Sequence, residues 1–185
     1  LHAVWNSMAS KYKNKNVSIP AIVYGHVPAC IVAVIILPTP SIESFPYIIL
    51  SALIHQGYQN FLLTAYQMGK FTTVYPVARG FGPLVATIIS IIFFGVYLKV
   101  FTLLSILLIS AGVIFIGLFS KSVLKNYKIL YTSLGTGFFI GIYSVVDGYG
   151  ARMSMSAISY MSWVFIISAL IFPIVLKFRK QKNIL

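Results

Sequence analysis

The chain has 185 residues, of which 59% are hydrophobic and 9% are charged, and its formal net charge is +12 at pH 7. A chain of this length cannot bury so large an apolar fraction within itself, so the composition excludes an ordinary soluble globular domain. The single cysteine, Cys30, excludes an internal disulfide.

Six apolar segments have about the 20-residue length with which a helix crosses a hydrocarbon layer of ~30 Å. In chain order they are Val17–Leu37, Tyr47–Met68, Phe71–Phe94, Val100–Phe119, Ile129–Val146 and Ile158–Leu176. A single segment of this kind can be a buried core helix, and this alternative stays open for the fifth, which is the shortest and is interrupted by glycines. Six in series are typical of a polytopic integral membrane protein, so we predict an all-α helical bundle.

The ends of the sequence suggest that further helices exist in the complete protein. The opening residues, LHAVWNSMA, have the pattern of the last turns of a helix, and the chain ends soon after KFRKQKNIL. We therefore expect a fragment of a longer protein. A signal peptide is not expected, because no small-residue cleavage site follows a basic start and apolar segments continue throughout.

Basic residues are concentrated in alternate connections between the predicted helices. The odd-numbered connections contain most of the 14 Lys and Arg residues, namely Lys11, Lys13, Lys15, Lys70, Lys121, Lys125, Lys128, Lys177, Arg179, Lys180 and Lys182. The even-numbered connections contain only Lys99 and Arg152. Because translocation of Lys and Arg is disfavoured, we expect an inner (plasma) membrane protein with its odd connections in the cytoplasm. Nucleic acid is not an expected partner, since its binding needs basic residues on one exposed face.

A weak internal similarity relates residues about 138 to 139 positions apart. AVWNSMASKY (3–12) resembles GIYSVVDGYG (141–150), and the charge of the connections that follow reverses between the two copies. A second copy that enters the membrane upside down shows this reversal. We therefore predict inverted five-helix repeats, the first covering residues 1–119 and the second, incomplete, covering residues 120–185.

Several stretches of the chain carry a family resemblance. They are HAVWNSMASK (2–11), GYQNFLLTAYQMGKFTTVYPVARGFGPLVA (57–86), FFGVYLK (93–99) before LLISAGVIFIGL (107–118), and GIYSVVDGYGAR (141–152). On these stretches the sequence resembles the drug/metabolite transporter superfamily, in particular its EamA-type ten-helix carriers. The chain differs from the family at Gly95-Val96, where Gly-Glu is common, and at Thr102, where Gln is common.

A polar stripe runs along the segment IHQGYQNFLLTAYQMG. Gln56, Gln59, Asn60 and Gln67 fall within an arc of about 100° on a helix, with His55 at its edge. Carboxamides are costly in hydrocarbon without hydrogen bonds, so the stripe must face protein or a water-filled cavity. Hydrogen bonding between helices and lining of a substrate cavity both stay open, and the two are compatible.

Arg79 lies inside a predicted membrane segment, in the stretch TVYPVARGFGPL. Pro76 and Pro83 on either side cannot donate backbone hydrogen bonds, and no acidic residue lies in the middle of a predicted segment. One interpretation is an Arg that snorkels to the cytoplasmic surface. The other is that Arg79, with Tyr75 one turn earlier, binds an anionic or zwitterionic group of a substrate.

Other positions are expected to contribute to the same cavity or to its scaffold. The cavity candidates at repeat-related or neighbouring positions are Trp5, Asn6 and Tyr143. Packing and an aromatic belt are the alternative for them. Asp147 is expected at a helix end, where ordinary solvation is the simpler interpretation and proton coupling the alternative. Gly137 and Gly141 are expected to form a close helix-packing face.

No group of residues has the spacing of a catalytic or metal site, since three histidines, one cysteine and two acids are scattered along the chain. We therefore expect no enzyme activity, no metal and no cofactor. The prediction is a secondary transporter that moves a small anionic or zwitterionic metabolite by alternating access. Its expected partners are the substrate and the lipid bilayer, with a homodimer left open. The alternatives are an intramembrane enzyme, a channel and a non-transporting membrane scaffold.

Overall fold

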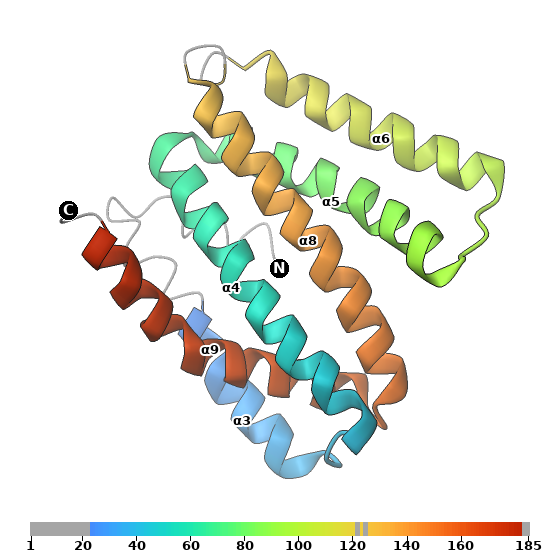
Figure 1. Ribbon diagram of the computed structural model, residues 1–185, viewed down its shortest axis with the longest axis vertical. Helices are drawn as coiled ribbons and strands as arrows, with labels where there is room; N and C mark the ends of the chain where they lie inside the picture. Colours follow the sequence, from blue (N-terminus) through green and yellow to red (C-terminus); the bar gives the residue numbers. More distant parts are fainter. Residues whose placement is uncertain (1–22, 121–122, 124–125, 183–185) are drawn as a thin grey trace. The chain divides into compact units, whose positions relative to one another are not determined.

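The computed structural model describes residues 23–120, 123 and 126–182, and this part of the chain is all helical, with no strand (Figure 1). The helices are α3 (Val27–Ile36), α4 (Phe45–Met68), α5 (Phe71–Phe94), α6 (Val100–Leu118), α8 (Tyr127–Met153) and α9 (Ala157–Lys182). A short 3₁₀ helix, η1 (Ile42–Ser44), precedes α4. The predicted all-α fold class is confirmed for these residues.

Each of the six predicted apolar segments overlaps a helix, and α5 matches its prediction at both ends. The largest difference is in α8, which continues to Met153, whereas the prediction ended it at Val146. The added part contains Gly150, where the Tyr160 ring packs in the place of a side chain, 2.5 Å from an ideal Cβ position.

The boundaries of α5 follow from its backbone chemistry. Lys70 is extended and precedes the first turn, and the helix assignment runs through Pro76 and Pro83. The helix ends at Gly95, whose φ of 58° is in the left-handed region that glycine adopts without strain. The Val96 N–H then donates to the Ser90 carbonyl at 3.2 Å, which satisfies one of the last backbone acceptors.

Among the described residues, three helices are long and apolar enough to cross a membrane: α5, α8 and the Ala157–Lys177 part of α9. Two shorter apolar helices cover Val23–Ile36 and Val100–Phe115. These lengths and compositions indicate a membrane protein. The number of membrane crossings stays a prediction.

The distribution of side chains is also typical of a helical membrane protein. Small polar side chains are buried between the helices, among them Ser44, Ser51, Ser110, Ser133, Thr136, Ser159 and Ser168. Large apolar side chains face outward, among them Ile35, Ile92, Phe93, Phe101, Leu108 and Leu170. In hydrocarbon, hydrogen-bonded polar groups belong inside the bundle, and apolar groups are stable on its surface.

The described residues divide into two compact units, each assembled from separate parts of the chain. The first unit, residues 57–145, contains α5, α6 and the adjoining parts of α4 and α8. The second unit, residues 23–56 and 146–182, contains α3, α9 and the remaining parts of α4 and α8, with α3 packed on α9. The predicted repeat boundary at residues 119/120 falls within the first unit and stays a prediction.

Glycines let the helices of the first unit approach closely. An added Cβ at Gly137 would lie 2.7 Å from the Ala78 carbonyl oxygen of α5, and one at Gly141 would lie 2.5 Å from Val85. The predicted packing face on α8 is therefore confirmed, with α5 as its partner. On another face of α5, an added Cβ at Gly80 would lie 2.7 Å from Val113 of α6. α5 therefore packs closely on both α6 and α8, and residues of α5 also line the pocket described below.

Candidate functional site

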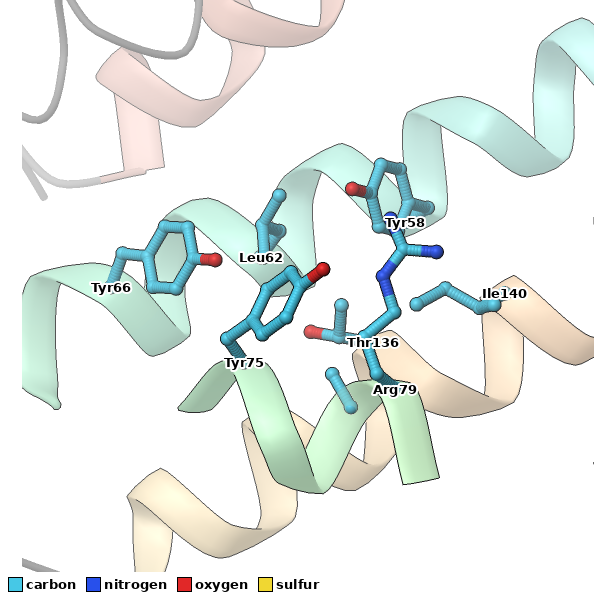
Figure 2. A pocket seen from close by; sticks show the side chains of 8 residues that line it. Tyr58, Leu62, Tyr66, Tyr75, Arg79, Thr136 and Ile140 are labelled. Carbon is cyan, nitrogen blue, oxygen red and sulfur yellow. The ribbon is translucent and has the colours of Figure 1, made fainter. Parts of the chain in front are cut away.

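A pocket lies within the first unit, between α4, α5 and α8 (Figure 2). Its lining residues are Tyr58, Leu62 and Tyr66 of α4, Tyr75, Ala78 and Arg79 of α5, and Thr136 and Ile140 of α8. On each helix the lining residues recur at spacings of three or four, which places them on one face. The pocket is thus built from one face of each of three helices.

Arg79 supplies the only positive charge among the lining residues. It lies eight residues into α5, about 12 Å along the helix from Phe71, which is well inside a candidate membrane span. Its guanidinium Cζ is 5.6 Å from the centroid of the Tyr75 ring, a cation–π distance. Figure 2 shows the guanidinium extending from α5 toward Tyr58 on α4.

Arg79 forms no ion pair within the described part of the chain. The chain contains two acidic residues, Glu43 and Asp147, and neither pairs with it. Glu43 is exposed, while Asp147 accepts a hydrogen bond from Tyr160. A half-buried cation inside an apolar span therefore has an aromatic face and no carboxylate as its described partner.

Aromatic rings surround this cation. Tyr75 stacks on Phe71 with 4.9 Å between ring centroids, and Phe71 contacts Tyr66 at 5.8 Å. Tyr58 packs edge-on against Tyr143 of α8 at 5.6 Å. These contacts restrict the tyrosine rings and so fix the direction of their hydroxyl groups around Arg79.

The Tyr66 hydroxyl is buried and has no hydrogen-bond partner among the described residues. Figure 2 shows it directed along the pocket toward Leu62 and Tyr75. The Thr136 hydroxyl, in contrast, donates to the Thr132 carbonyl at 2.7 Å. A buried hydroxyl without a partner costs about 1–3 kcal/mol, so Tyr66 is the polar group of the pocket that gains most from a ligand.

The cavity volume is about 10 Å³, which is room for about one water molecule. A metabolite therefore does not fit between these side chains as they stand. Binding of anything larger requires that the helices or the rings around Arg79 move apart.

The structure brings some of the predicted site residues together. Arg79 and Tyr75 both line the pocket, and Tyr143 touches its wall through Tyr58. Gln59 is buried in the same unit but does not line the pocket. Trp5 and Asn6 lie outside the described residues.

The other predicted amides of α4 have different surroundings. Gln56 lies in the second unit, where its Nε2 donates to the Ser168 carbonyl at 3.0 Å and to the Ser168 hydroxyl at 2.9 Å. These two bonds join α4 to α9. They correspond to one of the two interpretations of the polar stripe, hydrogen bonding between helices. Asn60 is half-buried, and Gln67 is exposed near the end of α4.

Sequence reasoning did not find the tyrosines of α4. Tyr58, Leu62 and Tyr66 occupy a face rotated by about 110° from the centre of the amide stripe. Their spacing of four was the available signal, but amides in an apolar helix are the more unusual feature and directed the prediction to a different face of α4. Which face meets α5 is decided by packing, which the helical period does not show.

Asp147 corrects a second expectation. Ordinary solvation at a helix end was the simpler interpretation, yet Asp147 is only 8% exposed and lies within α8. The reason is the continuation of α8 past Gly148 and Gly150, which places the carboxylate against α9 rather than in a connection.

Within the part of the chain that the structure describes, no three His, Cys, Asp or Glu side chains are grouped to hold a metal. The fold and the pocket together define a helical membrane protein with a cationic, tyrosine-lined pocket in one of its units. No family model, curated protein or solved structure matches the chain.

Proposed function

We propose that this chain is part of a multi-pass carrier of the inner membrane, of the EamA kind within the drug/metabolite transporter superfamily. The carrier moves a small anionic or zwitterionic metabolite by alternating access and makes no covalent change to it. The observation that carries the proposal is Arg79, a cation inside a candidate membrane span that has no carboxylate partner among the described residues.

The energetic argument starts from the cost of that cation. Charged side chains within hydrocarbon are expensive and are retained where a partner or a water-filled path accepts them. A guanidinium presents a planar fork of donors that matches a carboxylate or phosphonate in a bidentate way. A substrate anion would supply the countercharge that the described residues do not place beside Arg79.

The remaining lining suggests the rest of the substrate. The rings of Tyr58 and Tyr75 offer flat apolar surfaces beside the charge, and the Tyr66 hydroxyl offers a hydrogen bond. These features favour a compact molecule with one anionic end and an apolar or aromatic body, such as an amino acid or a small organic acid.

Two features support alternating access. The pocket has room for about one water molecule, so a bound metabolite needs a conformation other than the closed one described here. Inverted repeats, which the sequence predicts, are an architecture in which two bundles rock around a central site.

The test is counterflow in liposomes that contain the full-length protein, with a panel of radiolabelled amino acids, organic acids and phosphonates as probes. We expect saturable exchange of at least one probe. Arg79→Ala should reduce its kcat/KM by about 100-fold, and Arg79→Lys by about 10-fold, because a lysine keeps the charge but loses the bidentate geometry.

The control is Lys99→Ala, which removes an exposed basic residue before α6 and should leave exchange at the wild-type rate. Flux that does not saturate would indicate a channel, and no flux of any probe would favour a scaffold. Exchange at the wild-type rate by inserted Arg79→Ala protein would show that Arg79 does not bind the substrate.

A further inference from the structure

Four polar side chains form a buried cluster in the second unit, apart from the residues that line the Arg79 pocket. Ser51 and His55 come from α4, Asp147 from α8 and Tyr160 from α9. Their exposed fractions are 0%, 6%, 8% and 0%. The cluster joins an acid and an imidazole in a place from which water is largely excluded.

Asp147 is held by neutral donors. The Tyr160 hydroxyl donates to Asp147 Oδ1 at 3.3 Å, and the Ser51 hydroxyl lies within reach of the same carboxylate. Gly150 makes this approach possible, because an added Cβ there would lie 2.5 Å from the Tyr160 hydroxyl oxygen. Tyr160 is also packed against Ile48 and Val164, so its position is fixed by the core.

His55 is oriented by a bond to its own helix. Its Nδ1 is 2.9 Å from the Ser51 carbonyl oxygen and 3.2 Å from the Ser51 hydroxyl oxygen. A carbonyl oxygen can only accept, so Nδ1 carries a hydrogen and donates to it. The basic nitrogen of a neutral His55 is therefore Nε2, which is where the ring can take up a second proton.

His55 and Asp147 lie within electrostatic range of each other. Among the residues that the structure describes, Tyr160 is the other titratable group that acts on Asp147. On the far side of His55 stands Phe165, whose ring is 6.0 Å from that of His55 and 4.6 Å from that of His26 on α3.

The remaining charged side chains near this part of the unit are exposed. Glu43 precedes α4 and Arg152 lies in the last turn of α8, and both face outward. No Lys or Arg forms an ion pair with Asp147 among the residues that the structure describes. The charge of the buried cluster is therefore set by its own protons.

The electrostatics of such a pair favour one bound proton. With one proton shared between a carboxylate and an imidazole the pair is neutral overall, either as two neutral groups or as an ion pair. Removing that proton leaves a net negative charge, and adding another leaves a net positive charge, both of which are costly in a low-dielectric interior. If the surroundings of this pair differ between two conformations of the protein, the number of protons bound to the pair differs as well.

We propose that His55 and Asp147 form a proton-binding site that couples substrate movement to the pH gradient across the membrane. The coupling rests on the proposed carrier function, whereas the proton site itself does not. One proton binds to the pair from one side of the membrane and leaves it toward the other in each cycle, and no electron is transferred. Tyr160 is a positioning residue that donates to Asp147, and Ser51 is a positioning residue that orients the His55 ring.

A first experiment measures proton binding without any substrate. Full-length protein with ¹⁵N-labelled histidine is placed in lipid nanodiscs and titrated by NMR from about pH 5 to about pH 8, the range in which histidine changes charge. His55→Gln identifies the His55 signals. We expect the titration midpoint of His55 to differ by at least about half a pH unit between wild type and Asp147→Asn, because coupled groups share their protons.

The matched control is Glu43→Gln, which neutralises the other acid of the chain and should leave the His55 midpoint unchanged. His26→Gln is a second control, because it removes the imidazole on the other side of Phe165. It should also leave the His55 midpoint unchanged. A His55 signal that does not titrate, or that titrates identically in wild type and Asp147→Asn, would overturn the proton site whether or not the protein transports anything.

A second experiment separates coupling from transport, with the same radiolabelled panel in liposomes. Wild type should accumulate its probe when a pH gradient is imposed. Asp147→Asn should keep counterflow in the absence of a gradient but lose at least about fivefold of the gradient-driven accumulation, as expected for a typical coupling between two sites. Tyr160→Phe should show a smaller loss, and Glu43→Gln none.

The outcomes distinguish the two proposals. Counterflow by wild type that does not respond to the pH gradient, or full accumulation by Asp147→Asn, would overturn the coupling and leave the carrier intact. Absence of counterflow would overturn the carrier, and the NMR titration would then decide on the proton site alone.

Discussion

The two units of this protein each hold an ionisable group in apolar surroundings, but the two groups have opposite signs and different neighbours. In the first unit the charge is the Arg79 cation, and no described carboxylate pairs with it. In the second unit the charge is the Asp147 carboxylate, with a tyrosine, a serine and an imidazole around it and no Lys or Arg paired with it. On the two proposals made above, the compensating charge in each place is one that can leave, a substrate anion in the first and a proton in the second.

The two sites also differ in how their polar groups are hydrogen-bonded. In the Asp147 cluster Tyr160 donates to the carboxylate, and His55 donates to the Ser51 carbonyl oxygen. The Arg79 pocket retains a buried Tyr66 hydroxyl with no described partner. A buried hydroxyl of this kind favours a ligand that brings its own polar atoms.

The largest expected effect comes from giving Arg79 a permanent countercharge. Thr136 is buried in the pocket wall, and Thr136→Asp places a carboxylate there, with Thr136→Asn as a control of nearly the same shape. We expect Thr136→Asp to be more stable than Thr136→Asn by about 1–3 kcal/mol and yet to lose about 100-fold in kcat/KM of counterflow. Equal stability of the two variants in thermal unfolding would show that Arg79 does not lack a partner.

The next effect tests the helix contact that shapes the pocket. Gly137→Ala adds a methyl group 2.7 Å from the Ala78 carbonyl oxygen, so α5 and α8 must separate. We expect a loss of about 1–3 kcal/mol in the free energy of unfolding, together with weaker substrate binding. Gly112→Ala is the control, because nothing lies within 4 Å of its added Cβ. Similar melting temperatures for both variants would contradict the close α5–α8 packing.

The corresponding change in the second unit is Gly150→Ala. The new methyl group displaces the Tyr160 ring from Asp147, and we expect a loss of about 1–2 kcal/mol in unfolding free energy, with reduced gradient-driven accumulation. Gly148→Ala, two residues earlier on the same helix, meets nothing within 4 Å and should behave as wild type. Because Gly150 lies outside the Arg79 pocket, counterflow without a gradient should persist in both.

Tyr66→Phe should affect stability and transport in opposite directions. Removing a buried hydroxyl without a described partner should leave the unfolding free energy unchanged or raise it by up to about 1 kcal/mol. The same change should raise KM by about 3- to 10-fold if the hydroxyl binds substrate. Thermal unfolding and counterflow on the same preparation measure both quantities, and a clear loss of stability would mean that the hydroxyl has a structural partner.

The smallest expected effect is that of Gln56→Leu. The change removes two hydrogen bonds to Ser168 on α9 and should cost about 0.6 to about 1.7 kcal/mol, the range measured for polar contacts between membrane helices. KM should not change, since the amide does not line the pocket. A large rise in KM would assign Gln56 to substrate binding after all.

Much of the scaffold could be predicted from the sequence because it depends on local chemistry. The apolar segments predicted every helix of the described residues except the short η1, and Gly137 and Gly141 predicted a close packing face. The association of Arg79 with Tyr75 followed from their spacing of four on one helix. These features involve residues of one helix, or residue types whose preference is independent of a particular neighbour.

The composition of the two sites could not be predicted in the same way. The tyrosine face of α4 and the amide stripe are both regular at helical spacing, and only the approach of α5 and α8 selects the tyrosines for the pocket. Ordinary solvation was the simpler interpretation for Asp147 because the predicted helix ended beside it. In the structure α8 continues past it, and the Tyr160 ring of the next helix fills the space beside Gly150.

The sequence by itself determined that this protein is helical and typical of a membrane protein, and that Arg79 is a charge within an apolar segment that has no acidic residue near its middle. Helix length, apolar composition and the scarcity of acids settle these points, because each is a property of the chain before it folds. Only the tertiary structure decided which side chains surround Arg79 and that Asp147 meets His55 and Tyr160. Contacts between helices depend on close packing of particular shapes, and no local pattern in the chain records which shapes will meet.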